Sequence, residues 1–380
     1  MDIIYFDNAA TTKIKTEVLN EMMPYLTRNY GNASSLYSIG RLSKRAIENA
    51  RRQVAQLINC NPNEIYFTGS GSESDNTALK GYAYANKSRG NHIITSKIEH
   101  SAILETCKNL EDKGFEVSYI NVDENGILNL EELKKAIKPS TILISIMFAN
   151  NEIGTIEPIE EISKIAKENN IIFHTDAVQA LGNTKIDVQK TNIDMLSMSG
   201  HKINAPKGIG ALYIKNGINI ERFIDGGHQE KNRRAGTENV ASIVGMGKAC
   251  EIANKNFEIH TKSLKKLRDY YIAKITKEMG DKIRINGTLG NRLPGNANIS
   301  FKGIDGSELV YRLDEYNICV SSGSACSSKN TTPSHVLEAI NVPEEFLTGA
   351  IRTSFGDNNT FEEINYLINC LKKITKNNTN

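Results

Sequence analysis

The sequence lacks the features that mark secreted, membrane-spanning and zinc-stabilised proteins. Its six cysteines are scattered and none forms a Cys-x-x-Cys pair, which argues against a disulfide framework and a structural zinc site. The most apolar run, ILISIMF at residues 142–148, is far shorter than the roughly 20 residues that span a bilayer. The opening stretch MDIIYFDNAATT has no basic segment followed by a long apolar run, so we expect no signal peptide. We therefore expect a soluble, cytoplasmic protein with reduced thiols.

An excess of charge is also missing. The chain carries 46 basic and 44 acidic residues, for a formal net charge of +2, so its overall charge does not indicate a nucleic-acid-binding protein. With 380 residues, of which 39% are hydrophobic and 24% charged, a packed core is expected. This length suits one large domain with a smaller one, or two domains of ordinary size.

Short β-branched runs alternate with helical patterns through the first two thirds of the chain. Apolar residues three and four apart predict helices at 130–137 and 159–169. Nearly continuous apolar strands separated by helices indicate an α/β fold with a parallel sheet covered on both faces, where ligands bind beyond the carboxyl ends of the strands. The predicted strands are residues 93–96, 117–120, 142–148, 171–174, 195–198 and 211–214.

The pattern changes after about residue 236. A long helix is predicted at 240–279, followed by the strand-like stretch NANISFKG and the Gly/Ser-rich segment CVSSGSACSSKNTTPS. We expect a large domain over 16–255 and a smaller one over 256–380, the latter containing a loop at about 320–335.

Four polar clusters follow predicted strands. FTGSGSESDN, at 67–76, is a Gly/Ser turn that opens a helix, which suits an anion but equally a capped helix without ligand. It lacks the Gly-Lys-Ser/Thr of a Walker sequence, and no dinucleotide fingerprint is present. The other three clusters contain His100, then Asp176 with Gln179, and finally Lys202 in SGHK.

Pyridoxal 5′-phosphate is one ligand that would use all four clusters together. Its aldehyde requires a lysine amine for a Schiff base, and its pyridine nitrogen requires a carboxylate. Its phosphate requires N–H and hydroxyl donors, and its ring requires a flat group to lie against it. The candidates for these roles are, in order, Lys202; Asp176; the Gly71–Ser72 turn with Ser199 and His201; and His100. One helix and one further strand are expected between Asp176 and Lys202.

The ordered motifs DNAATT, FTGSGSESDN, EHSAI, NNEIG, HTDAVQA, SGHK, RAGTENV, SSGSAC and PSHVL resemble those of the cysteine desulfurases. The resemblance extends from about Ile4 to Gly356. It implies a pyridoxal-phosphate-dependent transferase of fold type I. Its large domain would hold a mainly parallel seven-stranded sheet, beside a smaller α+β C-terminal domain on which an N-terminal segment, 1–15, packs. Loss of the reactive lysine would have indicated a non-catalytic protein of this fold, but the lysine is present.

The resemblance also assigns roles to residues of the cofactor site. Lys202 would form the Schiff base, with Lys207 as the nearest rival, and Asp176 would pair with the pyridinium. Gln179 would bond the ring hydroxyl, and His100 would stack on the ring and shuttle protons. The remaining assignments are Asn151 near the ring hydroxyl; Gly71, Ser72, Ser199, Gly200 and His201 at the phosphate; and Thr237 at the phosphate of a neighbouring subunit, which implies a homodimer.

Three further residues are assigned to the substrate. Arg352 would hold the carboxylate of L-cysteine, with Asn32 and Asn151 assisting. Cys326, surrounded by small polar residues, would take the sulfur as a persulfide. The form of this segment resembles the group that supplies iron–sulfur scaffold proteins, and the persulfide would transiently ligate a metal cluster there. Selenocysteine lyase, and sulfur supply for tRNA thiolation, are the alternatives.

Overall fold

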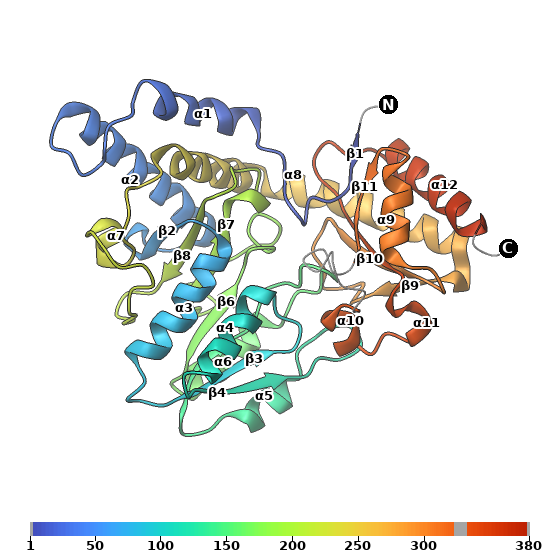
Figure 1. Ribbon diagram of the computed structural model, residues 1–380, viewed down its shortest axis with the longest axis horizontal. Coiled ribbons are helices and arrows are strands. Elements are labelled where there is room, and N and C mark those ends of the chain that lie inside the picture. The colour runs from blue at the N-terminus through green and yellow to red at the C-terminus, as the bar shows by residue number, and fades with distance from the viewer. Residues whose placement is uncertain (1–2, 323–332, 378–380) are drawn as a thin grey trace.

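A seven-stranded sheet forms one half of the molecule (Figure 1). The computed structural model describes residues 3–322 and 333–377. The strand order is β2-β8-β7-β6-β5-β3-β4, and β8 is antiparallel to both of its neighbours while the other pairs are parallel. The strands are β2 (Ile65–Thr68), β3 (His92–Ser96), β4 (Glu116–Ile120), β5 (Thr141–Ser145), β6 (Ile172–Asp176), β7 (Met195–Ser199) and β8 (Gly210–Ile214). The expected mainly parallel seven-stranded sheet is therefore confirmed.

Alternation of side chains along these strands builds two cores, one on each face of the sheet. Ile93, Leu143 and Met195 pack with helices α3 (Gly71–Ala85) and α4 (Ser101–Glu111). Their chain neighbours Ile94, Ile144 and Leu196 point to the opposite face, as a period of two requires. The helices of that second face are α1 (Thr16–Thr27), α2 (Ser38–Ile58), α5 (Leu130–Ala136), α6 (Ile159–Glu168) and the first part of α8 (Val240–Met279).

Two details of the large sheet differ from expectation. β5 ends at Ser145 although the apolar run continues to Phe148. The helix expected between Asp176 and Lys202 is absent, because residues 177–194 fold as successive turns. Gly182 within them takes a φ of +75°, a left-handed conformation that a regular helix does not accommodate.

The C-terminal part of the chain forms a separate four-stranded antiparallel sheet, in the order β12-β13-β10-β9. Residue Phe6 packs into its core, and β1 (Ile4–Tyr5) pairs in parallel with β11 (Ile318–Cys319). The N-terminal segment thus lies against the C-terminal sheet. The remaining elements are β9 (Ile283–Asn286), β10 (Asn296–Phe301), β12 (Ser321–Ser322), β13 (Ala350–Ser354), α9 (Gly306–Asp314), α10 (His335–Ala339), α11 (Glu344–Leu347) and α12 (Phe361–Asn377).

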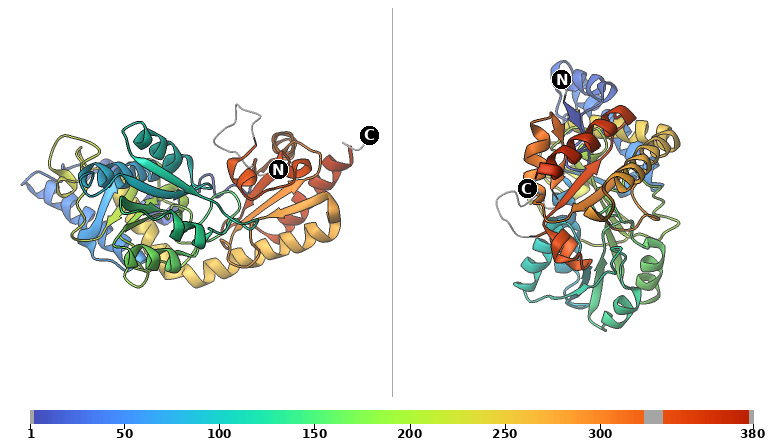
Figure 2. Two further views of the ribbon diagram at one scale, coloured as in Figure 1. Left: turned by 90° about the horizontal axis from the view of Figure 1, so that it is seen from below. Right: turned by 90° about the vertical axis from the view of Figure 1, so that its right-hand side faces the viewer.

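Helix α8 joins the two halves and runs along one side of both (Figure 2). Its bounds are those predicted from the sequence. Asn239 caps its start by accepting from the N–H of Ser242, and Gly280 ends it with a φ of +58°. The helix buries side chains near both its ends. Because it is continuous from residue 240 to residue 279, the predicted division between residues 255 and 256 falls inside it, and the domain boundaries remain a prediction. Within the described residues, no helix is long and apolar enough to cross a membrane.

A buried ion pair fixes the short, distorted turn α7 (Gln229–Asn232) beside the sheet. Arg51 of α2 donates two hydrogen bonds to Glu230, at 2.7 and 2.9 Å, and their side chains are only 3% and 4% exposed. Glu230 also accepts from the N–H of Phe67 in β2. Glu230, Lys231 and Asn232 all take positive φ values, a strained conformation that the surrounding contacts must impose. The pair thus sets the chain path toward Thr237.

Replacing Glu230 by Gln should destabilise the protein by about 3 kcal/mol or more, because Arg51 would keep a buried, uncompensated charge. The shift of the urea unfolding midpoint, followed by circular dichroism, measures this. Glu131→Gln is the matched control, since its partner Lys134 and Glu131 are 52% and 71% exposed; we expect no measurable shift there. Equal midpoints for the two variants would show that the Arg51–Glu230 pair does not hold this turn.

Candidate active site

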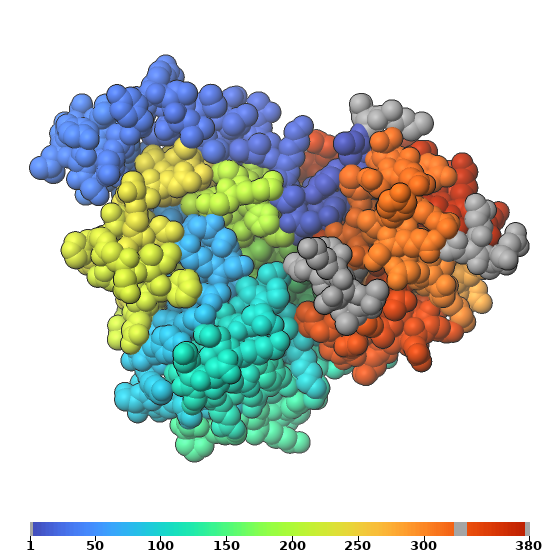
Figure 3. Space-filling view, in the orientation of Figure 1, coloured from blue at the N-terminus to red at the C-terminus, as the bar shows by residue number. Residues whose placement is uncertain are grey.

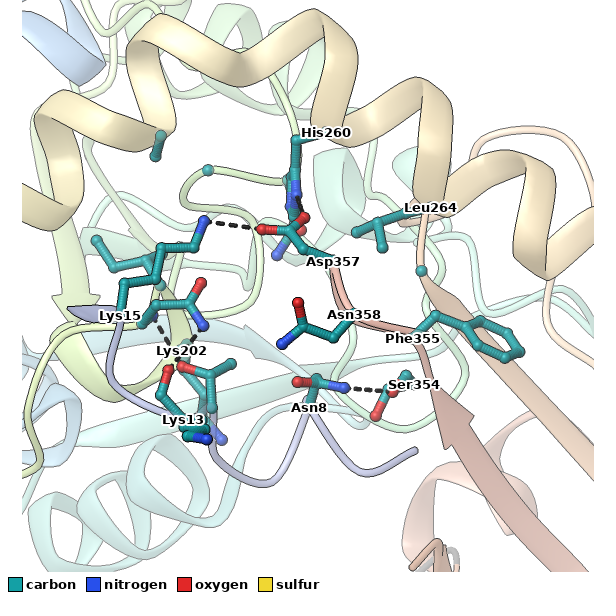
Figure 4. Close-up of a pocket in the computed structure, with 18 of the residues that line it drawn as sticks. Asn8, Lys13, Lys15, Lys202, His260, Leu264, Ser354, Phe355, Asp357 and Asn358 are labelled. Carbon is teal, nitrogen blue, oxygen red and sulfur yellow. Dashed lines mark hydrogen bonds and ion pairs between the residues drawn. The ribbon is translucent and has the colours of Figure 1, made fainter. Parts of the chain in front are cut away.

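Lys202 lies directly after strand β7, in the short 3-10 turn Gly200–Lys202. Its Nζ donates to the carbonyls of Ala9 and Ala10, at 2.6 and 2.8 Å. Thr12 of the same N-terminal segment donates to the carbonyl of His201. Lys202 also lines a cavity of about 1150 Å³ between the N-terminal segment and helix α8 (Figure 4). The amine is therefore held at the carboxyl end of the strand, with room beside it.

Asp176 ends strand β6, the neighbour of β7, and is only 6% exposed. Burial raises the pKa of its carboxyl, while His100, the N–H of Val178 and Lys202 oppose the rise. A buried carboxylate with a raised pKa lacks part of its counter-charge. A protonated pyridine nitrogen supplies such a charge, so Asp176 fits the ring of pyridoxal phosphate.

His100 caps the start of α4, where its Nδ1 accepts from the N–H of Ala102 at 3.1 Å. The bond assigns the ring proton of the neutral imidazole to Nε2. Burial lowers the pKa of His100; Asp176 opposes the effect, whereas Lys202 and His335 add to it. Each of the three groups His100, Asp176 and Lys202 perturbs the pKa of another, so the structure brings them together at this edge of the sheet.

The Gly/Ser turn at the start of α3 lies against the end of β7. A Cβ atom at Gly71 would stand 2.7 Å from Val178 Cγ2 and 3.3 Å from Ser199 Cβ, so only glycine fits there without displacing its neighbours. The first N–H groups of a helix have no intrahelical acceptor, and they carry its positive dipole. The residues gathered here, which suit a phosphate, are Gly71, Ser72, Ser199, Gly200 and His201.

His201 is a neutral donor or acceptor at this position. Burial, Lys202 and Lys207 together lower its pKa to about 4. Its Nδ1 lies 3.2 Å from the Thr11 hydroxyl. The buried Gln179, expected at the ring hydroxyl, donates from Nε2 to the carbonyl of Ala9. The N-terminal segment therefore contacts several of the predicted cofactor ligands.

Arg352 lies in β13 of the C-terminal sheet and is 3% exposed. Its Nη1 donates to the carbonyl of Asn151 at 3.1 Å, and its Nη2 donates to Asp7 at 2.9 Å and to the Ser321 hydroxyl at 3.2 Å. The structure thus brings the predicted substrate residues Asn151 and Arg352 together. Asp7 was missed by the sequence analysis: it begins the DNAATT motif, but its partner lies 345 residues further along the chain.

Three predicted residues are not brought to this cluster within the described chain. Thr237 is exposed. Asn32 is also exposed and accepts from the N–H of Ser34, and the connection from α1 to α2 that contains it lies at the end of the molecule opposite the C-terminal sheet (Figures 1 and 2). Cys326 lies outside the described residues.

The five described cysteines are free thiols that are poorly suited to sulfur chemistry. Burial raises the pKa of each, to about 12 for Cys250. Since the thiolate is the reactive form, none of these five is a ready nucleophile at neutral pH. The described residues also contain no group of three or more His, Cys, Asp or Glu side chains placed to hold a metal ion.

Known proteins resemble this chain in sequence and structure. The Aminotransferase class-V family matches residues 4–367. The chain is 52% identical to the "Cysteine desulfurase IscS" of Clostridium botulinum strain Hall, covering 98% of this chain and 94% of the relative. Identity is also 52% to the protein of that name from Methanosarcina thermophila, covering 98% and 92%. A solved "NifS-like protein" superposes with a TM-score of 0.93 at 39% identity, covering 98% of this chain and 99% of that one. The resemblance found in the motifs is confirmed: the chain belongs to the class-V aminotransferase family and, within it, to the pyridoxal-phosphate-dependent cysteine desulfurases.

Proposed function

We propose that this chain, a pyridoxal-phosphate-dependent cysteine desulfurase, converts L-cysteine to L-alanine and collects the sulfur on Cys326 as a persulfide. The observation that supports it most is the placement of Asp176 and Lys202 at the ends of the neighbouring strands β6 and β7, with His100 at the start of α4. The named relatives do not favour the alternatives, a selenocysteine lyase or a non-catalytic protein of this fold.

Bound pyridoxal phosphate supplies an electron sink for the α-carbon of the substrate. Asp176 would hold the proton on the ring nitrogen, and Gln179 would bond the ring hydroxyl. His100 would pack against the ring, and the N–H of Ala102 fixes the orientation of its imidazole. The Lys202 amine takes the α-proton once it is released from the carbonyls of Ala9 and Ala10. The phosphate is held by Gly71, Ser72, Ser199, Gly200 and His201.

The substrate carboxylate binds Arg352, whose planar guanidinium is suited to a two-point contact. Asn151 lies beside it, since its carbonyl accepts from Nη1. In the sulfur-transfer step, the Cys326 thiolate attacks the sulfur of the substrate. A sulfur–sulfur bond forms as the carbon–sulfur bond breaks, and the electron pair stays on the carbon fragment, which gains a proton and leaves as L-alanine. The carbon is reduced while the sulfur is oxidised, so the step requires no outside oxidant.

The sulfur acceptor is a scaffold protein of iron–sulfur cluster assembly, in this proposal. The relatives named IscS and the form of the segment around Cys326 support it. Transient ligation of an iron–sulfur cluster by the persulfide at Cys326 belongs to the same proposal, as does a cytoplasmic location. Delivery of sulfur for tRNA thiolation is the competing route.

A homodimer is the active form, in this proposal, because an apolar surface on and after α1 is left exposed in the single chain. Figure 3 shows the α1–α2 region along the outer edge of the molecule. Six large apolar side chains exposed within residues 19–37 favour an interaction site there. A second copy covering it would also supply the exposed Thr237 to the phosphate, and Asn32 to the substrate. The surface, which we name the α1 patch, consists of Leu19, Met23, Leu26, Tyr30, Leu36 and Tyr37.

Borohydride should fix the cofactor to Lys202, and the label should appear in the peptide that contains this lysine when the protein is digested and analysed by mass spectrometry. Lys202→Ala should lower alanine formation about 10²–10⁴-fold, the usual effect of losing a proton-transfer group. Lys207→Ala serves as the control because it is the nearest neighbouring lysine of the same motif. Labelling of Lys207 in the wild-type protein would reverse the assignment.

Cys326→Ser should retain the bound cofactor, with its visible absorption unchanged, but should form no persulfide and release no sulfur from L-cysteine in the absence of added thiol. Persulfide is measured by alkylation and intact-mass spectrometry. Cys319→Ser is a suitable control, since burial raises the pKa of that thiol. Native rates of sulfur release from Cys326→Ser would assign the acceptor role to another group.

Charges placed in the α1 patch should separate the subunits. We expect Leu26→Asp combined with Leu36→Asp to sediment as a monomer and to retain the cofactor more weakly, since Thr237 of a second copy would be lost from the phosphate. Tyr311→Asp, at a residue of α9 that is 70% exposed, is the control and should sediment as the wild type does. A wild-type protein that sediments as a monomer while holding its cofactor tightly would refute the dimer.

A further inference from the structure

The guanidinium of Arg352 already has most of its donors occupied in the absence of substrate. It carries five N–H groups. Both protons of Nη2 are used, one by Asp7 and one by the Ser321 hydroxyl, and Nη1 gives one to Asn151. Among the described residues Nε has no partner, although it is buried. An orphaned buried donor of this kind indicates a place for a ligand.

A carboxylate can bind a guanidinium by two parallel bonds on only two edges. One edge is formed by Nε and Nη2, the other by Nη1 and Nη2. Both edges include Nη2, whose two protons are taken. Neither edge is therefore free for a two-point contact, even though Nε is available. A substrate carboxylate that binds in this way must first displace one of the two acceptors on Nη2.

From this donor count, and resting on the function proposed above, we propose that Asp7 competes with the substrate for Arg352 and thereby sets the affinity of the site for substrate and product. Its carboxylate occupies Arg352 in the free enzyme and is displaced by the carboxylate of the amino-acid substrate.

Asp7 is the acceptor that leaves, for two reasons. Ser321 of β12 is the direct cross-strand partner of Arg352 in β13, so its position is fixed by the sheet. The Asp7 side chain is 15% exposed, and among the described residues its carboxylate makes no hydrogen bond other than the one to Arg352. The Asp7 carboxylate can therefore turn toward water without breaking any other hydrogen bond among the described residues. Two carboxylates on a single guanidinium would also repel each other, so the incoming carboxylate expels the like charge and leaves the neutral hydroxyl in place.

The pair limits the affinity of the substrate end of the site for carboxylates. While Asp7 neutralises Arg352, the site attracts anions weakly, and a thiol compound without a carboxylate has nothing with which to replace Asp7. Removing the charge of Asp7 should strengthen the binding of carboxylates in general. L-Cysteine and the product L-alanine should gain affinity together, because both bear the same α-carboxylate.

The test compares the holoenzyme with its Asp7→Asn variant. We expect KM for L-cysteine and the inhibition constant of L-alanine both to fall about tenfold, with kcat unchanged or lower because the product leaves more slowly. Asp194→Asn is the matched control: Asp194 pairs with Lys215, is 16% exposed, and precedes β7 at the strand end opposite Lys202. It removes the same charge and should change neither constant.

The outcomes separate this inference from the proposed function. A wild-type enzyme that makes no alanine from L-cysteine would overturn the proposed function itself. An active wild type whose Asp7→Asn variant shows unchanged or higher values of both constants would overturn only the role of Asp7, and higher values would make Asp7 a positioning residue for Arg352.

A crystal structure of the wild-type holoenzyme with L-alanine gives an independent test that does not depend on the variant folding. We expect the distance from Asp7 Oδ1 to Arg352 Nη2, 2.9 Å in the free chain, to exceed hydrogen-bonding range. A bound carboxylate held by two bonds beside an intact Asp7–Arg352 pair would contradict displacement.

Discussion

The active site depends on a buried negative charge, the carboxylate of Asp176. The parallel strands place it at the edge where β6 and β7 end, and the packed cores on both faces of the sheet keep water from it. An isolated carboxylate in such a place is unfavourable, and its raised pKa expresses this. His100 and Lys202 compensate it only in part. The remaining deficit would be met by the protonated ring nitrogen of pyridoxal phosphate, the partner proposed for this residue.

The N-terminal segment links this charge to the substrate end of the site. Its carbonyls at Ala9 and Ala10 accept from Lys202, which belongs to the seven-stranded sheet. Two residues earlier, Asp7 binds Arg352, which belongs to the C-terminal sheet. The side chain of Asn8 donates to the carbonyl of Ser354, which anchors the segment between the two contacts. One short stretch of chain therefore contacts both the amine and the guanidinium that the proposed reaction would use.

Much of the fold could be predicted because the strands and helices are encoded by local periodicity. Helix 240–279 was predicted from its helical pattern, and the structure shows Asn239 and Gly280 capping its two ends. Placing Asp176 and Lys202 at strand ends was sufficient to group them, because parallel strands end at one edge. The Asp7–Arg352 pair is different: no local pattern connects residues so far apart, and it is the bridge between Asp7 and Ser354, together with the pairing of β1 with β11, that brings the N-terminal segment to the C-terminal sheet. The helix expected after Asp176 was predicted wrongly, because the turns that replace it, with Gly182 in a left-handed conformation, leave no periodic pattern in the sequence. Thr237 and Asn32 could be assigned only through the family, because among the described residues neither is brought to the cluster around Lys202 and Asp176.

The division of the site between two sheets explains why the substrate should be an α-amino acid. Lys202 stands on the seven-stranded sheet and Arg352 on the four-stranded one, and the continuous helix α8 packs against the cores of both. A helix without a break resists bending, so the separation of the amine and the guanidinium is largely set by the fold. In the proposed reaction the α-amine of L-cysteine would join the cofactor at the Lys202 end of the site while its carboxylate binds Arg352, and an α-amino acid carries both groups on one carbon. The chemistry on sulfur would fall to Cys326, so recognition of the amino acid and reaction at its sulfur would be carried by separate parts of the chain.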